Sequence, residues 1–241
     1  MSADAQTAFD CIVVGSGHAG SCAALAAHDA GCKRVLIIEK SPPDWVGGNG
    51  YFTAGAHRTV HGGLHDLLPI VQNVSPEAAE TIDLAPYTAE DFTRDVMRLG
   101  NGRSHPDVVK ALVDGSRDAV QWLASRVRVP LIFSFHRQAY LVNGRQVFWG
   151  GLALSVEDGG KGLIAADRAA LAGAGVETWF NTAAVELLAD GGSIVGLKVS
   201  REGKTIALRT PAVVLACGGF EANKDLRAQY LGSEWERAKV S

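Results

Sequence analysis

The sequence predicts an α/β fold with a central parallel β-sheet, flanking helices and a smaller antiparallel β-sheet. Apolar runs at residues 10–14 and 35–39 enclose a helical stretch from about 18 to 30, which is the pattern of a βαβ unit. Alternating residues at 184–188 and 194–200 lie on either side of a turn that begins at Asp190, and this pattern is typical of antiparallel strands. A last apolar run, 213–220, reads as a buried strand that enters a glycine turn.

Length, charge and hydropathy exclude several classes of protein. A chain of 241 residues is long enough for one large domain or two smaller ones. Its net charge is -3 and it has no basic block, which argues against nucleic acid and anionic membrane surfaces as partners. No apolar run reaches the roughly 18 residues of a transmembrane helix, so we expect no membrane span. Residues 1–7 lack a positive patch and a long apolar stretch, so we expect no secretory signal.

The four cysteines, Cys11, Cys22, Cys32 and Cys217, form no Cys-x-x-Cys pair. Cys11 and Cys217 fall in predicted buried strands, and Cys22 falls in the predicted first helix. Buried, reduced thiols are the plain interpretation, and they predict a cytoplasmic protein.

The first βαβ unit carries the most informative motif of the chain. Gly15 allows a sharp exit from the strand, Gly17 lets the backbone approach a pyrophosphate, and Gly20 lets the helix pack closely on the strand. The helix N-terminus offers N–H groups to phosphates. Glu39 ends the second strand, 24 residues after Gly15, close to the spacing of a ribose-binding acid. A glycine turn without a ligand is the alternative, but the full context favours a Rossmann-type dinucleotide site.

Proline, glycine and hydrophobic periodicity predict the remaining elements. We expect loop and short helix over 60–88 and two helices over about 89–98 and 106–127. Ser104 is the expected capping residue of the second helix, and Pro106 follows it early in that helix. Asn143-Gly144 predicts a hairpin over 139–149. A helix over about 161–173 and a strand over 176–180 are also expected.

The order of these motifs resembles the FAD-dependent oxidoreductases typified by fumarate reductase and the succinate dehydrogenase flavoprotein. The glycine-rich passage Gly47–Arg58 looks closest to the tricarballylate dehydrogenase branch of that family. Gly159–Leu163, with Gly175 to Glu177 and Asn181-Thr182, is similar to the family's segment that leads to the adenine site. Ala212–Asn223 resembles its later strand and turn, and the match runs from about residue 9 to the end of the chain.

The resemblance implies one FAD-binding domain over 1–241. Within it lie a dinucleotide-binding βαβ unit (9–40), a flavin-proximal loop (47–58), a helical insert (about 89–127) and an adenine-side segment (160–223). Residues implied to cradle the pyrophosphate are Gly15, Ser16, Gly17, His18, Ala19 and Gly20. Glu39 would bind the adenosine ribose, with Lys40 and Ser41 beside it. Residues implied to approach the ribityl chain and flavin ring are Gly48, Asn49, Gly50, Thr53, Ala54 and Gly55. Ala184 would meet the adenine through its backbone, and Ala216, Cys217 and Gly218 would line the adenosine end.

Two departures from the family pattern affect the expected chemistry. Members that attach flavin covalently use a histidine before the glycine pair, whereas the comparable stretch here begins at Gly47 and reads Gly-Gly-Asn-Gly, so the resemblance implies non-covalent FAD. Family members are also roughly twice as long, and their cap domain and catalytic residues lie beyond the matched part. We therefore expect the cofactor half and name no catalytic residue.

Three functions remain open from the sequence. The first is a flavoenzyme that exchanges a hydride with a C–C bond beside a carboxylate or carbonyl of a small, tricarballylate- or fumarate-like substrate. The second is a truncated or split FAD-binding module that acts only with a partner chain supplying the cap and catalytic residues. The third is an NAD-binding protein, because Glu39 suits either cofactor.

Histidine and lysine patterns elsewhere carry weaker signals. The spacing of His57, His61 and His65 suits one helical face, but glycines within the run argue against a helix and no further ligand pattern favours a metal. We expect His57 and Arg58 to end the flavin-proximal loop, where either could touch a substrate carboxylate, and we expect the other two histidines to be solvated. Lys161 lies between glycines, and the absence of a following Ser or Thr excludes a Walker ATP loop.

Overall fold

The computed structural model describes residues 9–239 and divides the chain into two compact units. The first unit comprises Met1–Gly48 and Val176–Ser241, and the second comprises Asn49–Gly175. Residues 1–7, in which we expect no secretory signal, lie outside the described part of the chain. Within residues 9–239, no helix combines the length and hydrophobicity that crossing a membrane requires.

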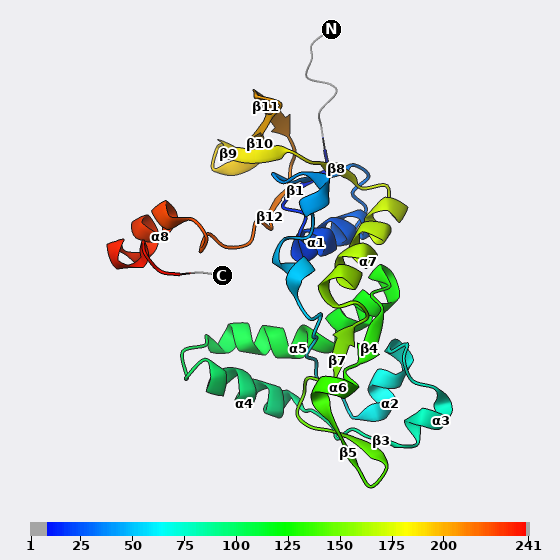
Figure 1. Cartoon of the computed structure of the whole chain (residues 1–241). Coiled ribbons are helices and arrows are strands. Elements are labelled where there is room, and N and C mark those ends of the chain that lie inside the picture. Colours follow the sequence, from blue (N-terminus) through cyan, green and yellow to red (C-terminus); the bar gives the residue numbers. More distant parts are fainter. Residues whose placement is uncertain (1–8, 240–241) are drawn as a thin grey trace. The chain divides into compact units, whose positions relative to one another are not determined.

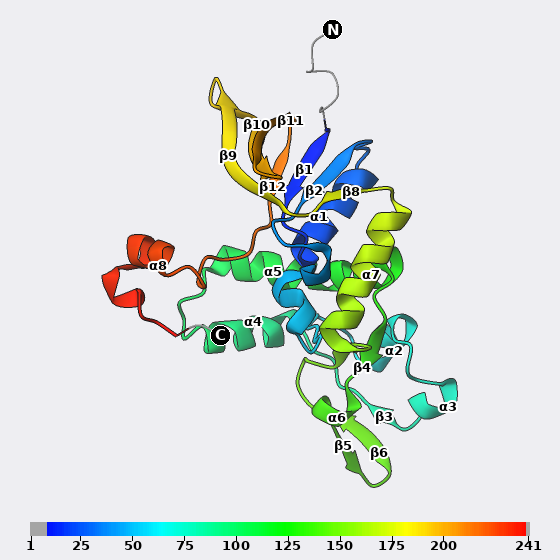
Figure 2. The ribbon, with the colours of Figure 1, turned by 45° about the horizontal axis from the view of Figure 1, so that its top comes forward.

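A parallel sheet forms the centre of the first unit, as predicted (Figure 2). Its strand order is β12 (Val213–Leu215), β1 (Cys11–Val14), β2 (Val35–Ile38) and β8 (Glu177–Trp179). Every pair is parallel, and helix α1 (His18–Asp29) crosses from β1 to β2. The residues of β1 and β2 are all buried, which suits the continuous Val and Ile runs of the sequence.

An antiparallel sheet completes the core of this unit. It joins β9 (Thr182–Asp190), β10 (Ser193–Arg201) and β11 (Lys204–Arg209) in the order β11-β10-β9. Its side chains Leu197, Val199 and Leu208 are fully buried against Ile12 and Leu36 of the parallel sheet. The two predicted antiparallel strands and their glycine turn are confirmed, and β11 is a third strand that was not predicted.

In the last helix of the first unit, α8 (Lys224–Leu231), one arginine binds the segments on both sides of the helix. The Arg227 side chain is only 5% exposed and donates to the backbone carbonyls of Glu221, Trp235, Glu236 and Ala238. A short 3₁₀ helix, Ser233–Trp235, packs against α8. A buried guanidinium is tolerated here because its donors are paired with carbonyls.

The second unit is built mainly from helices (Figure 1). Helices α4 (Ala89–Leu99) and α5 (Pro106–Trp122) pack on each other, and α5 continues as a π-helical turn over Leu123–Val127. The short helices are α2 (Leu64–Leu67), α3 (Pro76–Ala79) and α6 (Phe135–Gln138), and α7 (Gly159–Gly173) is longer. The helices predicted over 89–98, 106–127 and 161–173 are thus confirmed.

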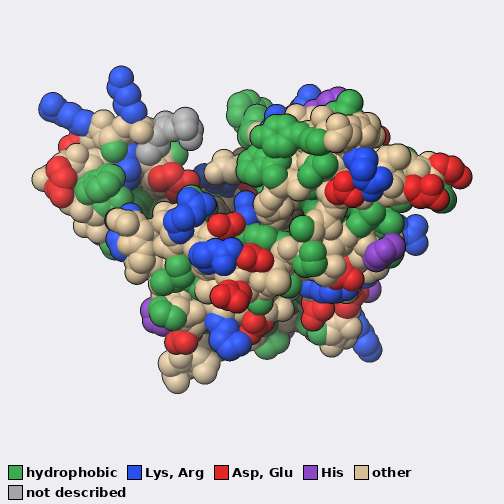
Figure 3. Space-filling view, turned by 90° about the horizontal axis from the view of Figure 1, so that it is seen from below, with side chains coloured by type: hydrophobic (Ala, Val, Ile, Leu, Met, Phe, Trp, Pro, Cys, Tyr) green, Lys and Arg blue, Asp and Glu red, His purple; other side chains and the backbone are tan. Residues whose placement is uncertain are grey.

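Short strands complete the second unit. The predicted hairpin is β5 (Ala139–Val142) and β6 (Arg145–Phe148), with Asn143 and Gly144 both at positive φ, and β3 (Ile82–Asp83) pairs with β6. Strands β4 (Leu131–Phe133) and β7 (Leu154–Val156) pair antiparallel. The hairpin exposes apolar side chains, with Tyr140 63% and Leu141 71% accessible. Seen from below, Figure 3 shows hydrophobic side chains gathered in patches among charged ones.

Three local predictions were wrong. The cap of α5 is His105 rather than Ser104, because Pro106 occupies the first helical turn and fixes the preceding residue in an extended conformation. His61 is buried rather than solvated, since its backbone pairs with that of Tyr87, and burial lowers the pKa of its imidazole. The run 213–220 is not a buried strand: β12 spans only Val213–Leu215, Leu215 is 61% exposed, and Cys217, two residues beyond the strand, is exposed as well.

Candidate functional site

Two glycines of the first turn are required by the packing of the chain itself. Gly15 leaves β1 at φ +106°, and a Cβ there would lie 2.4 Å from the carbonyl oxygen of Ala216. A Cβ on Gly20 would lie 1.9 Å from the carbonyl oxygen of Gly15. No side chain fits at either position, so the strand, the turn and α1 approach each other as the glycine spacing predicts.

Gly17 has no such packing requirement. A Cβ there would meet only the carbonyl oxygen of Gly47, at an ordinary 3.6 Å. Gly17 is the N-cap of α1, where no side chain caps the helix and no acidic residue stands in the first turn. No N-cap side chain therefore competes for the N–H groups of that turn, which lie at the positive end of the helix dipole. This open, uncapped turn fits an anionic diphosphate.

Glu39 follows β2, and its carboxylate accepts hydrogen bonds from Ser16, in the glycine turn after β1, and from Ser41, two residues further along the chain. Its Oε2 accepts hydrogen bonds from the Ser16 backbone N–H at 2.9 Å and from the Ser16 hydroxyl at 2.7 Å. Its Oε1 accepts from the Ser41 N–H at 2.8 Å. Burial raises the pKa of the Glu39 carboxyl, but the hydrogen bonds from Ser41 and Ser16 outweigh it and leave the pKa below its ordinary value. Glu39 is therefore an ionised acceptor.

Backbone hydrogen bonds join the adenine-side segment to Glu39 and Ser41. The Glu39 N–H donates to the carbonyl of Trp179, and the Thr182 N–H donates to the carbonyl of Glu39 at 2.9 Å. The Asn181 N–H donates to the carbonyl of Ser41 at 3.1 Å. These bonds bring the start of β9, with the exposed Ala184 two residues on, beside the predicted ribose acid.

The structure thus brings together most of the sequence-predicted residues of the first unit. Strands β1, β2 and β12 run parallel, so Gly15, Glu39 and Ala216 all lie at their carboxyl ends, where open α/β sheets bind ligands. Ala216 donates its N–H to the carbonyl of Val14 at 2.8 Å. The other predicted residues that directly follow these strands or begin α1 are Ser16, Gly17, His18, Ala19, Gly20, Lys40, Ser41, Cys217 and Gly218. Gly48 begins a 3₁₀ helix, and a Cβ on it would lie 3.9 Å from the Cα of Gly17.

The remaining predicted residues form a tight loop in the second unit. Thr53 Oγ donates to the carbonyl of Gly50 at 3.2 Å and accepts from the Gly55 N–H at 3.0 Å. The start of α7 fixes this loop, because the Gly160 N–H donates to the carbonyl of Thr53 at 2.8 Å. A Cβ on Gly160 would lie 2.2 Å from the carbonyl oxygen of Gly50. Chain packing therefore accounts for the glycines that meet here. Asn49 and Ala54 belong to the same loop.

Arg58, a candidate for binding a substrate carboxylate, already has an acidic partner. Its Nη1 lies 3.1 Å from Asp95 Oδ2 and donates to the Tyr87 hydroxyl at 2.8 Å. The Tyr87 hydroxyl in turn donates to Asp95 at 2.8 Å. His57 Nδ1 lies 2.8 Å from the carbonyl of Gly55. The charge of Arg58 is thus balanced within the second unit.

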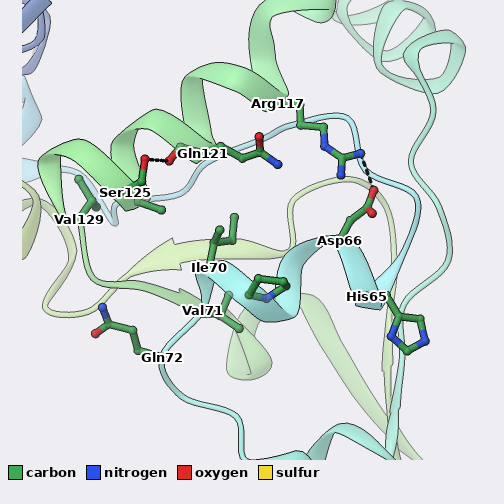
Figure 4. Close-up of a pocket in the computed structure, with 11 residues that line it drawn as sticks. His65, Asp66, Ile70, Val71, Gln72, Arg117, Gln121, Ser125 and Val129 are labelled. Atoms are coloured by element: carbon green, nitrogen blue, oxygen red, sulfur yellow. Dashed lines mark hydrogen bonds and ion pairs between the residues drawn. The ribbon is translucent and has the colours of Figure 1, made fainter. Parts of the chain in front are cut away.

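Two surface grooves also lie in the second unit. One, of about 580 Å³, runs between α5 and the chain around Pro69–Gln72, and Figure 4 shows the Asp66–Arg117 ion pair at one end. The other, of about 680 Å³, lies between α4 and α5. None of the residues predicted to bind the cofactor lines either groove.

Comparison with known families identifies the chain. Residues 75–237 match the family described as "FAD binding domain", and residues 10–134 match "FAD dependent oxidoreductase". The chain belongs to this FAD-binding family. It is the family of the fumarate reductase and succinate dehydrogenase flavoproteins, so the resemblance seen in the sequence is confirmed at this level.

Individual relatives support the assignment. The chain is 28% identical to an NADH:fumarate oxidoreductase of Klebsiella pneumoniae (strain 342) over 94% of its own length and 22% of the relative. It is 30% identical to a urocanate reductase of Eggerthella lenta, covering 93% of this chain and 34% of that one. The solved open conformation of a flavocytochrome c3 fumarate reductase superposes with a TM-score of 0.71 at 26% identity, over 93% of this chain and 36% of that one. The chain therefore spans about a fifth of the length of the first of these curated relatives and about a third of the length of the second.

Proposed function

We propose that this chain is the cofactor-binding part of an FAD-dependent oxidoreductase that acts on a small carboxylate-bearing substrate. The observation that carries the proposal is the arrangement at the edge of the parallel sheet. An uncapped helix start at Gly17 and an ionised carboxylate at Glu39 stand together there, as a diphosphate and a ribose require.

The chain's own residues supply binding and orientation. The N–H groups of the α1 turn would hold the diphosphate, and Glu39 would accept a ribose hydroxyl. The backbone of the segment from Asn181 to Ala184 would meet the adenine, and the loop at 48–55 would approach the ribityl chain and ring. When bound, FAD supplies hydride transfer with the substrate.

The names of the relatives and the sequence support the proposed substrate class. Fumarate is named in four of the curated relatives, and urocanate is named in another. The passage Gly47–Arg58 favours a tricarballylate-like acid among such substrates. Because the stretch that compares with the family's histidine and glycine pair begins at Gly47 and reads Gly-Gly-Asn-Gly, without a histidine, we propose non-covalent FAD. We further propose a cytoplasmic protein.

Reconstitution tests the proposal. The purified chain is titrated with FAD and, separately, with NAD, and binding is followed by flavin fluorescence and by the absorbance of the protein. FAD is expected to bind and to be released by acid precipitation, because no covalent bond holds it. A chain that stays colourless at saturating FAD, or that takes up NAD instead, would overturn the proposal.

The coverage of the relatives favours one alternative, a FAD-binding module that needs a second chain for catalysis. A self-sufficient enzyme and such a module are distinguished by adding fumarate or tricarballylate, with a suitable electron donor or acceptor, to the FAD-loaded chain. Turnover by the chain alone supports a self-sufficient enzyme. If the chain binds FAD but turns over no substrate, and a second chain restores turnover, the result supports the module.

A further inference from the structure

The contacts of Ser16 set it apart from the other residues of the glycine turn. Both of its donors go to the same carboxylate oxygen: the backbone N–H lies 2.9 Å from Glu39 Oε2 and the hydroxyl lies 2.7 Å from it. Ser16 is only 4% exposed, so its hydroxyl is shielded from water that could replace this bond. The resemblance implies that Ser16 contacts the pyrophosphate. In the structure, both donors of Ser16 instead bind Glu39, the predicted ribose-binding acid.

Ser41 supplies the other restraint on the Glu39 carboxylate. Its Oε1 accepts the Ser41 N–H at 2.8 Å, and a carboxylate offers about four acceptor positions in all. With Oε2 occupied twice by Ser16, the remaining position for a ligand hydroxyl lies on Oε1. A glutamate side chain has three rotatable bonds, and a freely rotating one would lose much of the benefit of a hydrogen bond to a ligand. Ser16 supplies the restraint on one oxygen that leaves the other in a defined place.

We infer that Ser16 is a positioning residue that fixes the Glu39 carboxylate for a hydroxyl of the adenosine ribose. This inference rests on the proposed function, since it concerns how the chain recognises FAD. It predicts that Ser16 affects FAD only through Glu39 and makes no contribution of its own to the phosphates.

Substitution of Ser16 and of a matched serine tests the inference. Ser16→Ala removes the hydroxyl, and Ser16→Cys keeps a side chain of similar volume with a weak donor. Ser21→Ala is the control, because Ser21 is also buried and lies in α1 but is not among the residues that donate hydrogen bonds to the Glu39 carboxylate. FAD affinity is measured with the apoprotein by fluorescence titration. Both Ser16 variants should bind FAD roughly tenfold more weakly, the size expected for a lost hydrogen bond to a charged group, while Ser21→Ala binds as the wild type does.

A second background separates positioning from direct contact. In a Glu39→Ala chain there is no carboxylate to position, so adding Ser16→Ala should cause no further loss of FAD affinity. An equal loss in both backgrounds would mean that Ser16 touches the cofactor itself, and it would overturn the inference. Equal behaviour of Ser16→Ala and Ser21→Ala would overturn it as well.

The pH profile gives a readout that a merely structural role would not move. Burial alone would raise the pKa of Glu39, and the Ser16 hydroxyl is one of the hydrogen bonds that oppose it. In Ser16→Ala the carboxylate should take up a proton at higher pH, so FAD affinity should fall on acidification sooner than in the wild type. An unchanged profile would count against the inference. A wild-type chain that binds no FAD at any pH would instead refute the proposed function.

Discussion

Gly17 and Gly20 differ in what a methyl group at each would meet. At Gly17 a Cβ has ordinary contact with the carbonyl of Gly47, so Gly17→Ala should change the free energy of unfolding by less than about 0.5 kcal/mol. FAD affinity should nevertheless fall by roughly tenfold or more, because the methyl would stand where the diphosphate approaches the backbone. Urea denaturation and FAD titration of the same sample check both parts. A stable variant with wild-type affinity would contradict the assignment of this turn.

Gly20 should respond in the opposite way. A Cβ there would lie 1.9 Å from the backbone oxygen of Gly15, so Gly20→Ala must push α1 from the turn and should destabilise the chain by about 1–3 kcal/mol. Gly115 in α5 provides a matched control, since a Cβ there meets nothing within 4 Å. Gly115→Ala should stabilise the chain by about 0.5–1 kcal/mol through helix propensity. Chemical denaturation of both variants at one pH should give changes of opposite sign.

At the scale of elements, α4 depends on a capping box. The Thr88 hydroxyl accepts the Asp91 N–H at 3.1 Å, and Asp91 Oδ2 accepts the Thr88 N–H at 3.1 Å. Thr88→Ala should therefore destabilise the chain by about 1 kcal/mol, as the loss of such caps does. Thr93→Ala, an exposed change within the same helix, should not destabilise it. Urea midpoints of the two variants measure the difference.

The same box predicts a pH dependence. The Thr88 N–H and hydroxyl, with Arg94, lower the pKa of Asp91 from 3.8 to about 2. A carboxyl with a lowered pKa in the folded chain stabilises it above pH 3.8, and that contribution is lost as the pH falls toward 2. An NMR titration of the Asp91 side chain should place its midpoint near 2 in the wild type and higher in Thr88→Ala. A wild-type midpoint at the ordinary value would show that the box does not form in solution.

Local patterns predicted the elements that local chemistry determines. The Val and Ile runs of β1 and β2 and the Asn143-Gly144 hairpin each carry their own signal, and all were confirmed. Strand β11 was not predicted, although Gly203 precedes it. Glu202 and Gly203 form the turn between β10 and β11, and both have positive φ. The burial of His61 and the bond from Ser16 to Glu39 join residues far apart in the sequence. No spacing rule shows such contacts, so the motif indicated the ribose acid but not the residue that holds it.

At the scale of the whole molecule, hydrogen exchange can test the predicted cofactor residues of both units in one experiment. FAD should slow exchange at the turn 15–20, at 39–41 and 181–184 in the first unit, and at the loop 49–55 in the second. FAD at about 100 times its Kd should stabilise the chain by about 2.7 kcal/mol if it binds only the folded state. ADP-ribose, which has the same adenosine diphosphate but no flavin ring, should protect the first-unit segments and leave 49–55 unchanged. Identical protection by both compounds would mean that the second-unit loop does not meet a flavin, and would favour a chain that recognises only the adenosine half of a dinucleotide.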